Sequence, residues 1–179
     1  MKKAIYLALI LFLSVFIFLP IPDFFAGSHT SSMIEHTLNQ KIQVQLPPSM
    51  QVSENPVGER RQLLYSVSLN DDTLLLRGYI QIWQLEDVEK FLTKGKEMSS
   101  YDFYSYTLNN VTVGNFNGLL NAWGASFGVH TKISGKEFWL RKSSSSKVLR
   151  IAFLTSNATF SEAQLKIMSP ILASVRWDE

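Results

Sequence analysis

The stretch "LLLRGYIQIWQLEDVEKFLTKGKEM", residues 74–98, changes its hydrophobic pattern near Leu85. Before that point alternate residues are apolar, which predicts a β-strand; after it apolar residues recur every three or four positions, which predicts an amphipathic helix. Glu86 and Asp87 stand at the start of the helical part and lysines come late, an order that favours interaction with the helix dipole. A strand that runs directly into a helix predicts a sheet with a helix packed on it.

The two faces of this predicted strand differ in chemistry. One face carries the residues of a core: Leu74, Leu76, Gly78, Ile80 and Ile82. The other face is amphipathic and aromatic: Leu75, Arg77, Tyr79, Gln81 and Trp83. Such a face suits either a covering helix or a protein partner. We therefore take Arg77, Tyr79 and Trp83, together with Trp139 on a later strand, as a candidate partner surface.

Alternating segments continue on both sides of this stretch, and turn residues separate them. Residues 62–69 are joined to the strand through Asn70, Asp71 and Asp72, which predicts a hairpin. The other segments with strand patterns are residues 41–48, 101–128, 136–141 and 147–154. In the last hairpin the serines at 143–146 fall where the chain must reverse, so we expect them to form a solvated tip rather than a binding site.

The C-terminal segment predicts a second helix. Ser161 and Gln164 have the spacing of a capping box, and Leu165, Met168 and Leu172 fall on one face. Pro170 lacks the N–H that a helix interior needs, so we expect a kink or a restart capped by Ser169. The complete order of elements predicts an α+β fold, in which an antiparallel sheet is covered by helices.

The N-terminal residues 1–27 have the pattern of an export signal. Lys2 and Lys3 precede an uncharged run from Ala4 to Leu19. Counted from Ala4 to Ala26, the apolar stretch has 23 residues and is long enough to be an uncleaved signal-anchor helix. Ala26 and Ser28 also fit a signal-peptide cleavage site, and both alternatives stay open. In either case the basic N-terminus predicts that the rest of the chain is extracytoplasmic, on the cell membrane or secreted.

Residues 28–40 connect this hydrophobic segment to the folded part. Ser31 or Ser32 could cap a short helix with Met33, Thr37 and Leu38 along one side, while the polar composition also fits a stalk. We therefore place the boundaries of the predicted domain at residues 41–179.

Composition and motifs exclude several classes of function. The 179 residues carry a net charge of +2 and have no cysteine, which argues against a nucleic-acid partner and excludes disulfides and thiolate sites. The three histidines, His29, His36 and His130, show no metal-binding spacing, and Ser126 in "WGASFG" lacks the spacing of a nucleophile elbow. We expect no cofactor, no metal and no catalytic residues.

The order of elements, together with the leader, resembles the PsbP-like fold group, which also includes exported bacterial DcrB-like proteins. The resemblance covers residues from Lys41 onward and rests on four motifs: "IQVQLPPSMQV", "IQIWQLEDVEKFL", "NVTVGNFNGLLNAWGAS" and "IMSPILASVRW". It implies an α/β/α sandwich and a non-enzymatic accessory or binding domain at the outer face of a membrane. Pro170 in the last helix departs from a smooth amphipathic pattern.

The sequence therefore predicts a membrane-tethered extracytoplasmic domain that binds or helps to assemble another envelope protein. A binder of a small amphipathic ligand in a groove between sheet and helix is the alternative, and an envelope hydrolase is a third. The ligand, the partner and the oligomeric state stay open.

Overall fold

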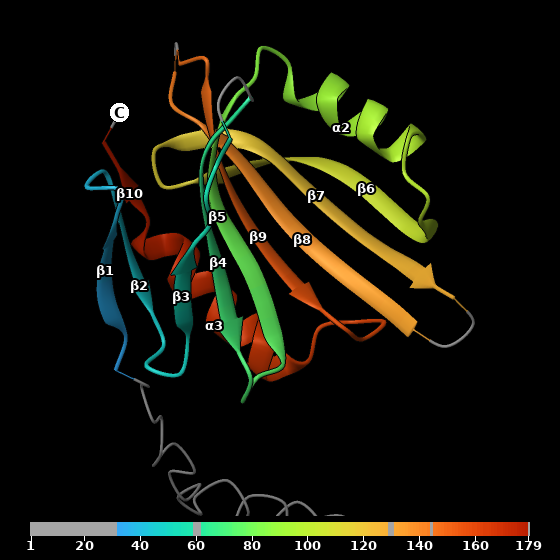
Figure 1. Ribbon diagram of the computed structural model, residues 1–179, viewed down its shortest axis with the longest axis horizontal. Helices are drawn as coiled ribbons and strands as arrows, with labels where there is room; N and C mark the ends of the chain where they lie inside the picture. The colour runs from blue at the N-terminus through green and yellow to red at the C-terminus, as the bar shows by residue number, and fades with distance from the viewer. Residues whose placement is uncertain (1–31, 59–61, 129–130, 144, 179) are drawn as a thin grey trace, which may run out of the picture. The chain divides into compact units, whose positions relative to one another are not determined.

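The computed structural model describes residues 32–58, 62–128, 131–143 and 145–178. Its centre is an antiparallel sheet of seven strands (Figure 1). In spatial order the strands are β3 (Gln51–Glu54), β4 (Leu63–Asp71), β5 (Leu76–Gln84), β9 (Lys147–Thr155), β8 (Thr131–Arg141), β7 (Phe116–Phe127) and β6 (Asp102–Val113). Neighbouring strands are mostly hairpin partners, as the turn residues between them predict.

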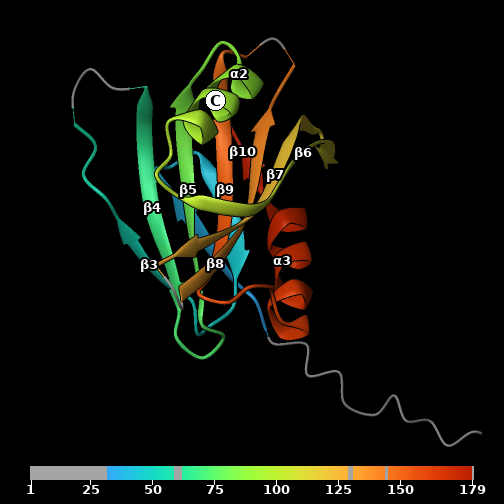
Figure 2. The same cartoon turned by 90° about the vertical axis from the view of Figure 1, so that its right-hand side faces the viewer.

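A smaller sheet and one helix cover the first face of the large sheet. The small sheet has the order β1 (Ile34–Leu38), β2 (Ile42–Leu46) and β10 (Arg176–Trp177). Helix α3 (Glu162–Ser174) lies along the same face (Figure 2). The main core lies between these layers, and its largest fully buried side chains include Trp177, Phe153, Ile42, Leu46, Ile80 and Ile171.

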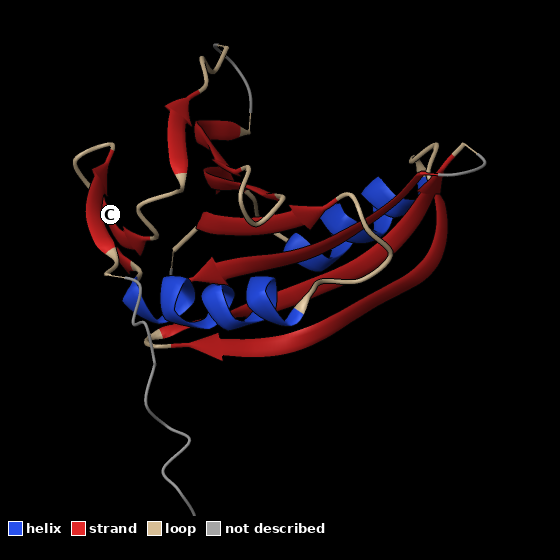
Figure 3. Ribbon diagram, turned by 90° about the horizontal axis from the view of Figure 1, so that it is seen from below, coloured by secondary structure: helices blue, strands red, loops and turns tan. Residues whose placement is uncertain are grey.

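Helix α2 (Val88–Glu97) covers the opposite face of the large sheet. Strand alternation explains the separation: Phe138 and Leu140 of β8 belong to the main core, whereas Trp139 between them packs in a second cluster with Leu92 of α2. In Figure 3 strands of the large sheet run between the two helices. The fold is therefore α+β with helices on both faces of an antiparallel sheet.

The strand-to-helix stretch has the structure that its pattern predicts. Leu76, Ile80 and Ile82 are buried in the main core, and β4 pairs with β5 as a hairpin. Asp87 caps α2 because its side chain accepts a hydrogen bond from the Lys90 N–H, 2.9 Å away. The predicted hairpin around the serines is also present, since β8 pairs with β9 on both sides of them.

The region before residue 41 differs from the prediction of a short helix or stalk. Residues 34–38 form strand β1, which pairs along its length with β2. Asn39 and Gln40 between the strands have φ angles of 49° and 56°, the left-handed values of a tight hairpin turn. The folded unit therefore begins before Lys41, and His36 lies half-buried on a strand.

Helix α3 has the predicted capping box, excludes the restart that was one of two alternatives at Pro170, and buries a different face from the predicted one. Ser161 accepts from the Gln164 N–H and the Gln164 side chain accepts from the Ser161 N–H. The helix continues through Pro170 without a restart at Ser169. Its buried face is Gln164, Met168 and Ile171, and Leu165 is 40% exposed, so the predicted face was rotated by about one residue.

The predicted signal or anchor segment, residues 1–27, lies outside the described residues. Within the part of the chain that the structure describes, no helix is long and apolar enough to cross a membrane.

Candidate functional site

The face of the sheet beneath α2 carries an unusual number of polar and aromatic side chains. We call it the α2-side face. Each strand contributes through alternation, because the residues between these positions point into the main core. From β4 to β6 the main contributors are Ser66, Gln81, Trp83, Arg150, Glu137, Trp139, Asn121, Trp123 and Tyr106.

A salt bridge forms the centre of this face. Glu137 of β8 and Arg150 of β9 lie 3.0 Å apart, with side chains that are 8% and 17% exposed. Glu137 also accepts hydrogen bonds from two indoles: Trp123 Nε1 at 2.8 Å and Trp139 Nε1 at 3.1 Å. A buried carboxylate needs this number of donors, and in return it fixes the orientation of both indole rings.

Further hydrogen bonds extend the network across the sheet. Arg150 Nη1 donates to Gln81 Oε1 at 2.7 Å, and Trp83 Nε1 donates to the same oxygen at 3.1 Å. Gln81 Nε2 in turn donates to Ser66 Oγ at 3.0 Å. The network thus links five neighbouring strands, from β4 to β7, and holds three tryptophans in fixed positions.

Two aromatic clusters pack around the hydrogen-bonded residues of the α2-side face. Trp83, Phe91 and Trp139 form a triangle with ring centroids 5.5–5.9 Å apart, in tilted arrangements. Tyr101, Phe103, Tyr106 and Trp123 form the second cluster, with edge-on and stacked contacts. Such arrangements are favourable between aromatic rings and give rigid, flat surfaces.

A cavity of about 250 Å³ lies between the two clusters, under α2. We call it the α2 cavity. The helix contributes Phe91, Leu92, Gly95 and Lys96 to its lining, and the sheet contributes the aromatic residues together with Asn121, Glu137 and Arg150. Pockets for drug-sized ligands have volumes of about 300–1,000 Å³. The α2 cavity therefore fits a molecule of one or two rings and not a long lipid chain.

Tyr106 connects the sheet to the helix at this cavity. Its hydroxyl donates to the Leu92 carbonyl oxygen at 3.3 Å. Burial raises the pKa of Tyr106, and the negative charge of Glu137 raises it further. The phenol therefore stays protonated at neutral pH and keeps its role as a donor to α2.

One polar atom at the cavity has no partner. Asn121 is 3% exposed and lines the α2 cavity, and its Oδ1 accepts no hydrogen bond. Two other buried side-chain atoms of the described residues share this property, Arg141 Nε and Trp177 Nε1, but neither residue lines this cavity. An unpaired buried acceptor is costly, so a donor brought by a ligand would be favourable here.

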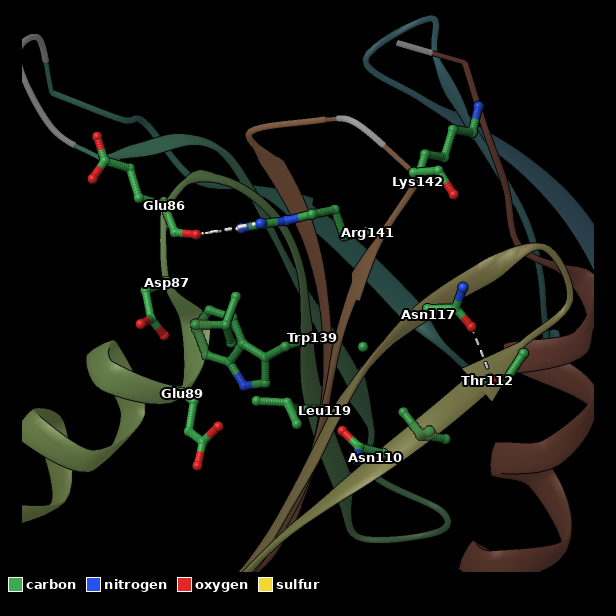
Figure 4. Close-up of a pocket in the computed structure, with 14 residues that line it drawn as sticks. Glu86, Asp87, Glu89, Asn110, Thr112, Asn117, Leu119, Trp139, Arg141 and Lys142 are labelled. Atoms are coloured by element: carbon green, nitrogen blue, oxygen red, sulfur yellow. Dashed lines mark hydrogen bonds between the residues drawn. The ribbon is translucent and has the colours of Figure 1, made fainter.

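A larger and more open hollow lies at the N-terminal end of α2 (Figure 4). Its volume is about 730 Å³, and Trp139 forms part of its wall as well as part of the α2 cavity. Several of its polar groups already serve local structure: Arg141 Nη2 donates to the Leu85 carbonyl oxygen at 2.6 Å, and Thr112 donates to Asn117 at 3.0 Å. Arg141 Nε, which also has no partner, belongs to a residue of this larger hollow. We take the smaller α2 cavity as the candidate binding site because its wall is mainly aromatic, whereas Trp139 is, among the described residues, the one aromatic residue that lines the larger hollow.

The structure separates the four residues of the predicted partner surface. Trp139 is 3% exposed and Trp83 is half-buried, and both pack beneath α2, so they form a cavity wall and not an exposed surface. Arg77 is exposed and Tyr79 is half-buried, and neither belongs to the cluster under α2. The covering helix, one of the two alternatives for this aromatic face, accounts for the difference.

The polar residues of the site were not predicted from the sequence. Glu137 and Trp139 are two residues apart on β8, so their side chains lie on the same face of the strand. This places a carboxylate on the buried α2-side face. That placement was the available signal, because a buried carboxylate requires a cationic or hydrogen-bonding partner. The identity of the partner, Arg150, depends on the register between β8 and β9.

The other candidate residues are dispersed or lie outside the description. His29 and His130 fall among the residues that the structure does not describe, and Ser126 is half-buried on β7. Within the described ranges, no group of three or more His, Cys, Asp or Glu side chains could hold a metal ion.

Comparison with known proteins gives a structural match. No protein-family model matches the sequence, and no curated protein matches it. The fold is similar to the solution structure of cyanobacterial PsbP (CyanoP) from Synechocystis sp. PCC 6803, with a TM-score of 0.52 and 8% sequence identity. The match covers 85% of this chain and 96% of that chain. The predicted resemblance is therefore confirmed at the level of the fold: this chain has a PsbP-like α+β fold.

Proposed function

We propose that this chain is a non-enzymatic, membrane-tethered extracytoplasmic domain that binds a small amphipathic ligand in the α2 cavity. The observation that carries the proposal is a rigid aromatic cavity whose wall contains the unpaired acceptor Asn121 Oδ1. The hydrophobic pattern of residues 1–27 supports the tether and the extracytoplasmic location.

The chemistry of the cavity favours binding over other roles. Ligand sites are mostly apolar with a few polar groups that fix orientation, and this cavity has that composition. The salt bridge and the indole hydrogen bonds hold the walls in place before any ligand arrives. A preformed site loses less conformational entropy on binding.

The proposal can be tested with indole, a neutral probe that has a flat apolar body and one N–H donor. Isothermal titration calorimetry would use the full chain in lipid nanodiscs, with empty nanodiscs as the blank. The key variant is Gly95→Leu, because Gly95 lines the cavity and a Cβ at this position meets no atom within 4 Å. Thr93→Leu is the matched control, since Thr93 is an exposed residue of the same helix outside the cavity lining.

We expect indole to bind the parent chain and Thr93→Leu alike, and Gly95→Leu to lose binding while it stays folded. Leucine is a better helix former than glycine, so loss of binding would not reflect loss of α2. Equal binding by all three proteins, or by none, would reject the α2 cavity as the site.

A protein partner is the second candidate function. It is favoured by Arg77 and Tyr79, which remain on the part of the α2-side face outside the cluster under the helix. A photo-crosslinking amino acid at Tyr79 in intact cells would test it, with the same group at exposed Thr93 as the control. A defined protein adduct from position 79 alone is expected; identical adducts from both positions would count against this surface.

A further inference from the structure

The charged groups around the α2 cavity do not cancel. Glu137 is paired with Arg150, which leaves Lys96 as the remaining charge in the lining. Lys96 Nζ lies 4.6 Å from the centroid of the Tyr106 ring, and among the described residues no carboxylate lies within salt-bridge distance of it. Lys96 is exposed and also lines the cavity, so its ammonium group stands where the cavity meets solvent.

This balance disfavours a cationic ligand. Aromatic walls attract cations, but here protein cations already occupy ring faces: Lys96 over Tyr106 and Arg150 over Trp139 at 5.1 Å. A third cation would meet repulsion from both, because only one carboxylate lines the cavity. An anionic group beside Lys96 would gain a counter-ion instead.

On the sheet side of the cavity, the ligand would have to supply a hydrogen-bond donor. Glu137 already accepts hydrogen bonds from Trp123, Trp139 and Arg150. Asn121 Oδ1 remains as the acceptor without a partner. A ligand atom on this side is therefore expected to be an N–H or O–H donor.

We propose that the ligand is a small aromatic acid. Its one or two rings would lie between the aromatic clusters, its carboxylate would pair with Lys96 Nζ at the edge of the cavity, and an N–H or O–H group would donate to Asn121 Oδ1. The inference rests on the proposed ligand-binding function and specifies the chemistry of that site.

A matched series of indoles tests each group separately on the full chain in nanodiscs. Indole-3-acetate carries both groups, indole lacks the carboxylate, tryptamine replaces it by an ammonium, and 1-methylindole-3-acetate lacks the N–H. We expect indole-3-acetate to bind at least about threefold more tightly than indole, in line with a partly exposed ion pair. Tryptamine should bind more weakly than indole, and the 1-methyl compound about fivefold to tenfold more weakly than indole-3-acetate, as for one lost hydrogen bond.

Two variants assign these effects to residues. Lys96→Gln should remove the advantage of indole-3-acetate over indole, whereas Lys94→Gln, in the same turn of α2 but outside the cavity lining, should leave it unchanged. Asn121→Ala should weaken indole-3-acetate but not its 1-methyl analogue. Circular dichroism spectra and melting temperatures of each variant would confirm that the fold is retained.

The outcomes separate this inference from the function on which it rests. If indole binds in a Gly95-dependent manner but tryptamine binds as well as indole-3-acetate, the acid is rejected and the ligand site stands. If the 1-methyl compound binds as tightly as indole-3-acetate, the donor to Asn121 is rejected. If no member of the series binds, both the inference and the proposed function fail.

Discussion

Glu137 and Arg150 form their salt bridge diagonally across two strands. The residue directly opposite Glu137 is Ala152, and the residue opposite Arg150 is Trp139, so the pair is displaced by two residues in the register. The small side chain of Ala152 leaves room for the long arginine, whose guanidinium group lies over Trp139. This diagonal arrangement lets one carboxylate hold a cation and two indoles together.

The first prediction concerns the charge of Glu137. Glu137→Gln leaves Arg150 without a counter-ion in a site where it is only 17% exposed, and it gives two indole N–H groups a poorer acceptor. Breaking one side of a buried pair costs about 3–5 kcal/mol, and we expect a loss near the lower end because Gln81 still accepts from Arg150. Urea unfolding followed by tryptophan fluorescence measures the change. The double variant Glu137→Gln/Arg150→Met should recover part of the loss; purely additive losses would contradict the coupling.

The second prediction concerns Gln164, a polar residue that is 2% exposed in α3. Its Nε2 donates to the carbonyl oxygens of Leu74 and Leu75, at 2.9 and 3.2 Å, and its Oε1 completes the capping box. Its Nε2 also donates to the buried Thr155 Oγ1 at 3.2 Å. Gln164→Ala removes the donor from these buried and part-buried acceptors and should lower the unfolding free energy by about 2–3 kcal/mol. Ser161→Ala, which removes only the cap, should cost about 1 kcal/mol. Equal effects of the two variants in thermal or urea unfolding would show that Gln164 acts only as a cap.

The third prediction compares two glycines. An added Cβ at Gly118 of β7 would overlap the carbonyl oxygen of Trp139 on β8, whereas one at Gly95 of α2 meets open space. Gly118→Ala should therefore separate the strands and cost about 1–3 kcal/mol or more. Gly95→Ala should raise the stability by up to about 1 kcal/mol through helix propensity. Paired unfolding curves test both signs, and a neutral Gly118→Ala would contradict the close approach of β7 and β8.

The fourth prediction is a dependence of stability on alkaline pH. The pKa of Tyr65 is raised to about 12, first by burial and then by its hydrogen bond to Glu54, 2.9 Å long, and by the charge of Glu54. Because the folded-state pKa lies above the ordinary value of 10, the stabilising contribution is complete below pH 10 and is lost as the pH rises toward 12. Tyrosinate absorbance of the parent chain minus that of Tyr65→Phe should show a titration well above pH 10. Glu54→Gln should lower this pKa, and a midpoint near 10 in the parent would contradict the assignment.

The elements that the sequence predicts well are those with strong local signals. The strand at β5, the charge order of α2, and the capping box of Ser161 and Gln164 depend on nearby residues, and all are present. Strand β1 was missed because Asn39 and Gln40 lack the glycine that usually marks a tight hairpin, although both adopt left-handed φ angles. Tertiary pairing with β2 determines this strand more than its own sequence does.

The site was harder to predict than the fold for a physical reason. Alternation identifies the face on which Trp83 and Trp139 lie, but it does not show whether α2 or solvent covers that face. The pairing of Glu137 with Arg150 depends on strand register, and the cavity depends on how closely α2 approaches the sheet. These are properties of packing between distant segments, and no single segment contains them.

The two-residue strand β10 has a consequence for folding kinetics. It pairs with β2, which lies early in the sequence, and its Trp177 packs in the main core beside Phe116. The small sheet that covers this core therefore combines the earliest and the latest described strands. Its pairing of β2 with β10 is a contact between residues far apart in the sequence. Until Trp177 is in place, β1 and β2 lack a completed core to pack on. A nascent chain can therefore complete this core only after Trp177 has been synthesised.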